Sequence, residues 1–459
     1  MAINIVLQAV GCLGQSSVLQ SGTWYKMAVD TRGVFKITYD QFKKMGFDPA
    51  SSDPRKIRIF GNSGGMLPQA NNLSRPADLE ETAIFVSGQA DESFDKEDFI
   101  IFFAEGPDKV DYDIDRHIFS YESNLYSKKN FYYITVSEDN GKRVEAVDNL
   151  DGNFPSLNTY EDYVYHEADE YNDQASGREW FGERYDLVTT YAYNFDVDGI
   201  VANSPVKLVS DVMAQSFNGS SFKLAVNRIA VGEQAVPVIS NTQYSVKGRH
   251  KRDTITFNAS AVGAPDNTKQ EVLYEYVKSP AGKNIGFLDF LLLTFDRTLS
   301  LYNDQSIFRS TASLEQPIST YNIRNVSEGS MIWDITNKAK IKSQSYQPNG
   351  EAVSFSTPSD DQLKEFIVFN TKIPAPEFIG AVPNQNLHGM SPVNLIIISH
   401  PQFLEEASRL AAHRIGHNQW SAAVVTPESI YNEFSSGRQD VSAIRDFVRS
   451  IYIKDPGQL

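Results

Sequence analysis

The sequence predicts a multidomain protein with a mostly-β N-terminal domain and a β-sandwich, followed by the first β-α units of a parallel α/β domain. Its 459 residues exceed what one ordinary hydrophobic core holds, so two to four domains are expected. Short alternating runs separated by Gly, Pro and Asn continue to residue 369, which is typical of β structure. After residue 391, apolar runs alternate with helix-spaced residues, the pattern of β-α units.

Shifts in this pattern divide the chain into six segments. One stretch is acidic and aromatic without regular alternation, and Pro374, Pro376 and Pro383 mark a later linker. The predicted segments are a signal-like segment at 1–21, a β-rich N-terminal domain at 22–159, a connecting segment at 160–186, a β-sandwich domain at 187–372, a linker at 373–390, and the truncated start of the α/β domain at 391–459.

The N-terminal domain is predicted to open with a β-hairpin. Residues 25–29 and 34–38 alternate in hydrophobicity on either side of turn residues 30–33. A short helix is expected at 39–45. Further short strands, separated by turn-forming residues, are expected at 57–60, 83–87, 99–103 and 131–136.

The second β region alternates in the manner of a β-sandwich, to which a second small sheet could be added. Asn218-Gly219 and Asn349-Gly350 are typical of two-residue hairpin turns, so each is expected to join two paired strands. The strands expected in this region include 206–212, 222–226, 254–258, 290–295 and 366–369.

The last stretch opens with an almost wholly apolar run at 393–399, as expected of a central parallel strand that helices cover on both faces. Pro401 stands where a helix would begin, and residues 422–425 supply a second strand. Thr426 and Asp440 can cap two further helices. We expect no third strand within the chain, so this α/β core is begun and not completed.

Composition and charge exclude several classes of protein. The chain is 41% hydrophobic and 22% charged, which is the composition of a folded protein rather than a disordered one. Its formal net charge of -16 and the lack of a basic block argue against binding to nucleic acid, because phosphate contacts need clustered Lys and Arg. No motif in the sequence indicates a bound cofactor.

The first residues resemble an export signal. Residues 3–13 are apolar and end in small residues, although no Lys or Arg precedes them. The run Ala9-Val10-Gly11-Cys12 approximates a lipoprotein cleavage box, and a buried terminal strand is the alternative. Cys12 is the single cysteine, so no internal disulfide can form. No membrane-spanning helix is predicted, because the apolar stretch 287–295 is short and contains Asp289.

Two patterns approach a metal site and stop short of one. Asp111, Asp113, Asp115 and Glu122 have calcium-loop spacing, but Arg116 stands where a glycine is needed, so a solvated acidic turn is the better interpretation. His413 and His417 have the i, i+4 spacing of helical zinc ligands. They lack the Glu of that motif and a further ligand, so exposed histidines at a helix end are expected.

No complete catalytic set is visible in the residues. His400 follows the first parallel strand, at the edge where open α/β sheets collect active residues, but a histidine in a turn is the commoner explanation. The glycine-rich run at 61–65 lacks the Lys-Ser/Thr of a phosphate loop and is interpreted as a turn. Cys12 has no electropositive neighbour. We therefore assign no catalytic, cofactor-binding or metal-binding residue.

Several stretches together resemble one family, the sortases of type IX secretion systems, which are gingipain-type cysteine peptidases. The resemblance extends from about Trp24 to the C-terminus. It rests on GVFKIT at 33–38, IFGNSGGMLP at 59–68, SGREWFGE at 176–183, PNQNLH at 383–388, YNEFSSG at 431–437 and AIRDF at 443–447. The region from 383 onward is similar to the entry into a gingipain-type peptidase domain.

The resemblance implies an exported enzyme at the outer membrane or cell surface of Bacteroidetes-type bacteria. Such an enzyme cleaves C-terminal sorting domains from secreted cargo and attaches the cargo to the cell surface through a lipopolysaccharide anchor. Its partners would be cargo proteins and outer-membrane components of the secretion system. The chemistry would use a Cys thiolate, a His base and an acyl-enzyme.

In this family the catalytic His and Cys follow later strands of the peptidase domain, so neither role falls on a residue of this chain. Cys12, His400 and His413 are not at the family's catalytic positions. We therefore expect the segment alone to be inactive. The alternative is a non-catalytic cell-surface module whose β domains bind other molecules.

Overall fold

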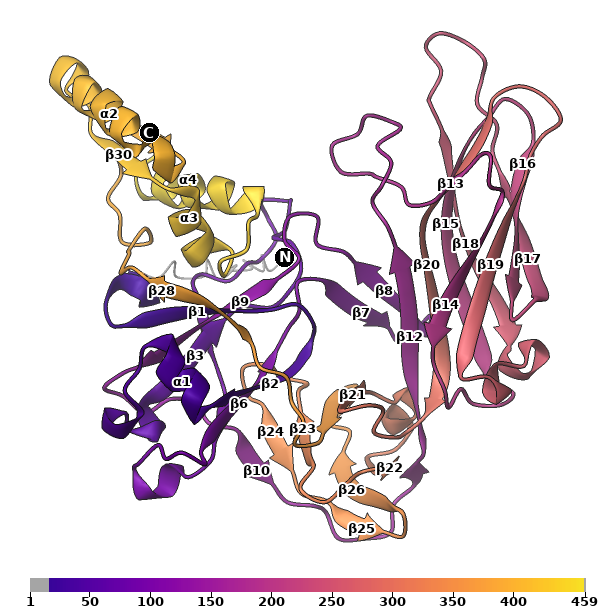
Figure 1. Cartoon of the computed structure of the whole chain (residues 1–459), viewed down its shortest axis with the longest axis horizontal. Helices are drawn as coiled ribbons and strands as arrows, with labels where there is room; N and C mark the ends of the chain where they lie inside the picture. The colour runs from indigo at the N-terminus through magenta and orange to yellow at the C-terminus, as the bar shows by residue number, and fades with distance from the viewer. Residues whose placement is uncertain (1–15, 458–459) are drawn as a thin grey trace, which may run out of the picture.

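The computed structural model describes residues 16–457, and this part of the chain is built mainly of strands (Figure 1). Figure 1 shows the N-terminal β domain in indigo, the β-sandwich on the opposite side of the molecule, and a third β unit in orange below them. The α/β segment, in yellow, lies above the N-terminal domain. The predicted fold class, β-rich domains followed by β-α units, is confirmed.

Two sheets pack face to face in the N-terminal domain, with strand orders β28-β1-β9-β3-β4 and β2-β6-β5. Met27, Ile37, Ile59 and Phe102 are among the buried residues of the core between them. The elements are β1 (Trp24–Val29), β2 (Gly33–Thr38), α1 (Tyr39–Met45), β3 (Ile57–Gly61), β4 (Glu80–Thr82), β5 (Ile84–Val86), β6 (Phe99–Ala104), β9 (Asn130–Val136) and β28 (Glu377–Val382).

The predicted hairpin at 25–38 is wrong, although both of its strands form. β1 pairs with β9 and β28, whereas β2 pairs with β6 in the other sheet. The turn between them therefore passes from one sheet to the other. β1 lies beside the apolar strand β9, and β2 lies beside the apolar strand β6. β1 and β2 therefore face the shared core from opposite sides. This arrangement buries more apolar surface than a two-stranded ribbon would.

The predicted linker at 373–390 contains strand β28, which is an edge strand of the N-terminal sheet. Trp24 lies opposite Val382, and Ala28 lies opposite Glu377. Pro376 and Pro383 flank the strand, where a missing N–H does not interrupt the ladder. The chain therefore returns to the N-terminal domain before the α/β segment begins.

The predicted signal-like segment, 1–21, extends too far. Its apolar run and Cys12 lie outside the described residues, but residues 17–20 belong to the folded domain. Leu19 is fully buried beside Trp24, and its carbonyl accepts a hydrogen bond from the N–H of Gln385 (3.0 Å). A leucine with this degree of burial is part of the core.

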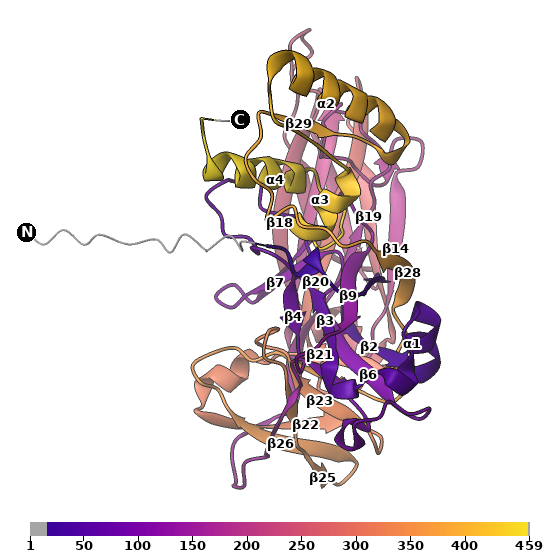
Figure 2. The same ribbon diagram turned by 90° about the vertical axis from the view of Figure 1, so that its left-hand side faces the viewer.

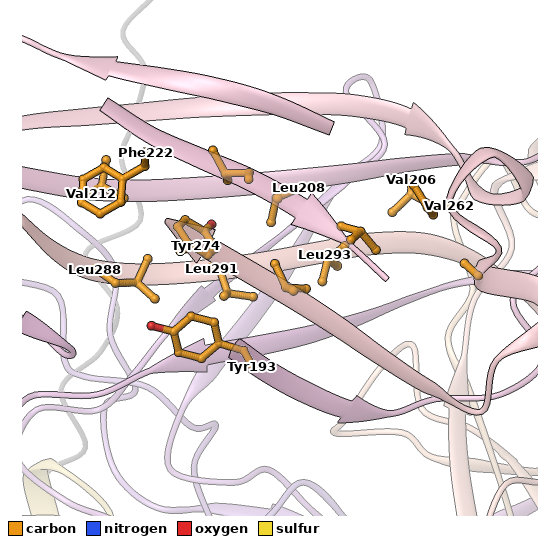
Figure 3. Packing of buried hydrophobic residues seen from close by; sticks show 14 of the residues in the cluster. Tyr193, Val206, Leu208, Val212, Phe222, Val262, Tyr274, Leu288, Leu291 and Leu293 are labelled. Atoms are coloured by element: carbon orange, nitrogen blue, oxygen red, sulfur yellow. The ribbon is translucent and has the colours of Figure 1, made fainter. Parts of the chain in front are cut away.

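The β-sandwich packs the sheet β12-β20-β15-β18 against the sheet β14-β19-β16-β17, and short β13 also pairs with β20. Figure 3 shows Val212, Phe222, Tyr274 and Leu288 in the core between them. The strands are β12 (Thr159–Glu167), β13 (Arg184–Tyr185), β14 (Thr190–Asp196), β15 (Pro205–Ser216), β16 (Ser220–Val226), β17 (Ile229–Val236), β18 (Arg249–Asn258), β19 (Lys269–Val277) and β20 (Asn284–Thr298).

Two expectations for this region need correction. The predicted connecting segment, 160–186, supplies most of β12, whose residues pair with β20 along their whole length. Asn218-Gly219 does not close a hairpin, because β15 before it and β16 after it lie in different sheets. The turn carries the chain across the sandwich, an outcome that the dipeptide alone does not distinguish from a hairpin.

The rest of the predicted sandwich domain forms a separate β unit with two sheets, β10-β24-β23-β27-β21 and β11-β22-β26-β25. Strands β10 and β11 come from the end of the predicted N-terminal domain, 22–159, so that predicted domain extends too far. Asn349-Gly350 joins the paired strands β25 and β26, as predicted. The strands are β10 (Glu145–Val147), β11 (Ser156–Leu157), β21 (Gln305–Phe308), β22 (Ile318–Arg324), β23 (Met331–Asp334), β24 (Lys342–Gln344), β25 (Gln347–Asn349), β26 (Ala352–Pro358) and β27 (Phe366–Phe369). Trp333 packs with Phe103, so this unit also covers the outer face of β6.

The C-terminal segment contains two parallel strands and three helices. β29 (Leu395–Ile398) pairs with β30 (Ala422–Val425), and the helices are α2 (Leu404–Asn418), α3 (Pro427–Phe434) and α4 (Val441–Lys454). Thr426 and Asp440 cap α3 and α4 by accepting backbone N–H groups, as predicted. Within the described residues, β29 has one strand partner and is half-buried, so its predicted cover on both faces is incomplete here. No helix among residues 16–457 has the length and apolar character needed to cross a membrane.

Candidate functional site

The carboxyl ends of β29 and β30 form the edge at which an open parallel sheet binds its ligands. The Ser399 N–H donates to the Val425 carbonyl (3.0 Å), so the two strand ends meet there. His400 lies at this edge and is exposed, but its Nδ1 accepts the backbone N–H of Gln402 (3.2 Å). The Ser399 hydroxyl donates to the His400 carbonyl (3.2 Å). His400 is therefore a helix-entry residue, in agreement with the interpretation as a turn histidine.

The position of this edge is set by α3 and α4, which dock on the N-terminal domain through a buried polar network. The Asn432 Oδ1 accepts hydrogen bonds from Lys26 Nζ (2.9 Å) and the Tyr133 hydroxyl (2.8 Å). Lys26 also donates to the carbonyl of Gly437 (3.3 Å) and lies 4.3 Å from the ring centroid of Phe131. The hydrogen bonds of Asn432 and Gly437 join residues about three to four hundred positions apart.

The loop after α3 packs where β3 ends and β9 begins in the N-terminal domain. The Ser436 hydroxyl donates to the Phe131 carbonyl (3.0 Å) and accepts the backbone N–H of Asn62 (3.1 Å). Arg438 is almost completely buried, and its guanidinium donates to Asn130 Oδ1. The end of β3 and the start of β9 therefore each supply a hydrogen-bonding partner to the loop.

Helix α4 is held by the segment that follows the glycine-rich turn. The Asp440 Oδ2 accepts the N–H of Leu67 (2.8 Å), while its Oδ1 caps the helix. Arg75 forms an ion pair with Asp446 at 2.8 Å. Leu67 is buried with Phe447, so the polar contacts surround a small apolar centre.

Glu433 is the most densely bonded anion of the interface, and its side chain is fully buried. Its carboxylate accepts Gln385 Nε2 (2.8 Å) and the backbone N–H groups of Leu387 (2.8 Å) and His388 (2.9 Å). Three donors on one carboxylate make a strong charge-assisted site. His388 Nε2 lies 3.7 Å from Asp78 Oδ1, which brings the N-terminal domain into the same cluster.

Burial shifts the titration of several groups in this interface. It lowers the pKa of Lys26 to about 8, against a smaller opposing effect of Glu428. It lowers the pKa of Arg438 and raises that of Tyr133 well above its usual range. The pKa of Asp78 is also raised by burial. Buried charges of this kind add little net stability by themselves, but removing one partner leaves the other uncompensated.

Most of the motifs singled out in the sequence meet at this interface. The glycine-rich run at 61–65 is a turn, as predicted, and its Asn62 also contacts the loop after α3. Gly64 is required there, because a Cβ would lie 2.2 Å from the Gly106 carbonyl oxygen. The anchoring side chains were missed, since a polar residue in a motif does not reveal its distant partner. The SGREWFGE motif at 176–183 lies instead on the β-sandwich.

The other sequence candidates remain apart from this site. Asp111 and Asp113 lie on β7 (Lys109–Asp113) and Glu122 on β8 (Ile118–Glu122), which pair as an antiparallel hairpin instead of forming a calcium loop. His413 and His417 are exposed on α2, with ring centroids 5.5 Å apart. Cys12 lies outside the described residues.

Known proteins share both the segment and the fold. Residues 389–458 match the model of peptidase family C25. The crystal structure of dimeric latent PorU from Porphyromonas gingivalis superposes with a TM-score of 0.81 at 24% identity, covering 95% of this chain. The chain has a PorU-like fold. It spans 40% of the PorU chain.

The PorU-like fold confirms the resemblance seen in the motifs, and the C25 match falls on the predicted α/β segment. A carbohydrate-binding module of the CBM36 type, in complex with calcium and xylotriose, gives a TM-score of 0.18 at 14% identity over 28% of this chain and 97% of its own. A likeness of that size does not bear on function. No curated protein sequence matches the chain.

Proposed function

We propose that this chain is the N-terminal part of a PorU-like sortase of the type IX secretion system. The observation that carries the proposal is the PorU-like fold over 95% of the chain, together with the docking of residues 389–458 on the N-terminal domain. These residues match peptidase family C25 and are called the C25 segment below. In this proposal the whole protein is exported to the outer membrane or cell surface. It cleaves C-terminal sorting domains from secreted cargo and attaches that cargo to the cell surface.

The proposed chemistry is thiolate attack with a His as base. Neither group is assigned to a residue of this chain. The role proposed for the described residues is to hold the first two parallel strands, β29 and β30, in one orientation. A catalytic site at the carboxyl edge of that sheet depends on this orientation, because small misplacement of catalytic groups is costly to the rate.

The test compares the product of the complete reading frame with the 459-residue chain on a cargo protein that carries a C-terminal sorting domain. We expect the reading frame to encode further parallel strands with a His and a Cys, and its product to remove the sorting domain. The 459-residue chain serves as the inactive control. A stop codon after Leu459, with a soluble and monodisperse product that leaves cargo intact, would contradict the proposal.

A cleft favours a second candidate function, a binding module. A cavity of 580 Å³ opens where the N-terminal domain, the β-sandwich and the third β unit meet. Tyr121, Tyr163, Tyr165 and Tyr302 line it, and tyrosines supply flat apolar area with a polar tip, which suits peptide or glycan recognition. Calorimetry of the 459-residue chain with intact cargo tests this function: binding that Tyr163→Ala weakens supports it, and the lack of binding contradicts it.

A further inference from the structure

A cluster of Asp211, His250 and Asp289 lies on the outer face of the β-sandwich, away from the interface that holds the C25 segment. The three residues stand on the adjacent strands β15, β18 and β20. Their neighbours Val212 and Leu288 point into the core between the sheets (Figure 3). The cluster therefore faces away from that core, and it has no part in the function proposed above.

A β-bulge brings Asp289 to this face. In the pairing of β15 with β20, Asp211 lies opposite Phe290 and Val212 lies opposite Leu288, so Asp289 is the extra residue of the bulge. Bulges re-aim a side chain at the cost of a ladder bond and occur next to functional sites. The bulge therefore places the carboxylate of Asp289, within the apolar strand β20, beside Asp211 and His250.

The geometry of the cluster leaves an oxygen without a partner. One ligand atom from each of the three residues lies within 4.8 Å of the others. Asp211 is only 5% exposed, and its Oδ2 accepts Arg252 Nε at 2.6 Å. Its Oδ1 makes no hydrogen bond within the described residues and lies 3.7 Å from His250 Nδ1. Buried polar atoms without a hydrogen-bond partner are uncommon in folded proteins, and a bound ion can satisfy such an atom.

The SGREWFGE motif supplies the second carboxylate that faces this histidine. Glu179 Oε1 lies 3.8 Å from His250 Nε2, on the opposite side of the ring from Asp211. Phe181 is fully buried and lies against the imidazole, with ring centroids 5.2 Å apart. At 3.8 Å this contact is an ion-pair distance and not a hydrogen bond, so Nε2 has no hydrogen-bond partner within the described residues. A carboxylate on one side of the imidazole, with the other nitrogen free to coordinate, is the usual arrangement around a protein-bound metal.

We propose that Asp211, His250 and Asp289 bind one Zn²⁺ ion, with Glu179 orienting His250. Two carboxylates and an imidazole suit a borderline transition metal, whereas Ca²⁺ takes six to eight oxygen ligands. Arg252 donates its hydrogen bond to Oδ2 of Asp211, so Oδ1 and the space between the three ligands stay open to an ion. Asp289 also lines a cavity of 540 Å³, from which a water molecule can complete the coordination.

The test uses the 459-residue chain after treatment with a chelator, titrated with Zn²⁺ alone by calorimetry and checked by elemental analysis. Every protein in the series carries His413→Ala and His417→Ala, because that exposed pair on α2 could hold zinc weakly. We expect one Zn²⁺ per chain. Asp289→Asn and His250→Gln are expected to weaken binding about 100-fold or more, and Glu179→Gln about tenfold.

Asp253→Asn is the matched control, because it removes a carboxylate from the same strand β18 without touching the cluster; it should bind zinc normally. Circular dichroism of the zinc-free proteins reports whether each variant folds, and Asp289→Asn keeps the volume of the side chain. Two results would overturn the proposal: the absence of stoichiometric zinc in the parent protein, and unchanged affinity in a folded Asp289→Asn variant. The first result would mean that a protonated His250, rather than a metal ion, holds the carboxylates together, and the second would place the bound zinc at other residues.

Discussion

The two halves of the C25 segment differ in what covers their apolar side chains. Helices α3 and α4 bury Ile430 and Phe447 completely. They also place Glu433 in a polar network that reaches Asp78 of the N-terminal domain through His388. Strands β29 and β30 are half-buried, and α2 lies at one end of the molecule (Figure 2). Leu410 on α2 and Trp420 just after it are exposed. The N-terminal domain therefore covers the half formed by α3 and α4. The half formed by β29, β30 and α2 keeps apolar side chains exposed within the described residues.

This difference shows that docking and folding of the α/β segment are separate problems. The N-terminal domain supplies hydrogen-bond partners to α3 and α4, so their orientation is determined within the described residues. The sheet half keeps apolar surface open, and under the proposed function further strands of the peptidase domain cover it. Helices α3 and α4 therefore fix the position of the sheet to which those further strands would be added.

The largest expected difference between the halves is in the cost of removing an apolar side chain. We expect Phe447→Ala to lower the local free energy of unfolding of α4 by about 4 kcal/mol, because the ring is fully buried between α3 and α4. Leu410→Ala, on the exposed face of α2, should change the local stability by about 0.5 kcal/mol or less. Hydrogen exchange of the helix amides measures both, and equal effects would contradict the comparison.

A smaller loss is expected from the polar network. Glu433→Ala leaves Gln385 and two backbone N–H groups without their acceptor, which should cost about 3 kcal/mol in the local stability of α3. Glu433→Gln keeps an acceptor oxygen and is the matched control, with a smaller loss. The same hydrogen-exchange measurement applies. If both variants left α3 as stable as the parent, the network would not be what holds the helix.

The smallest effect is a pH dependence of docking. Burial lowers the pKa of Lys26 to about 8 in the folded chain, below its value in the unfolded chain. Between these values the unfolded state binds more protons, so stability rises with pH. The gain is about 1 kcal/mol from pH 7.5 to 9. Lys26→Met should remove this rise in the local stability of α3 and α4. A rise that persists in the variant would assign it to another group.

Local signals in the sequence predicted the elements well and their partners poorly. Thr38 and Gln41 form a capping box at α1, and Thr426 and Asp440 cap the last helices, so these starts are readable within a few residues. The pairing of β1 with β28 joins residues some 350 positions apart, for which the sequence carries no local signal. The same is true of the contact between Lys26 and Asn432. The bulge at Asp289 was hidden for another reason, because in the sequence the residue stands out only as an interruption of an apolar run.

The most direct test of the account is hydrogen exchange of the unmodified 459-residue chain, comparing α3 and α4 with α2, β29 and β30. Docking on the N-terminal domain predicts that amides of α3 and α4 exchange as slowly as those of β1 and β9, while those of α2, β29 and β30 exchange well before them. Equal protection of the two halves, or faster exchange in α3 and α4, would contradict the claim that the N-terminal domain anchors the C25 segment.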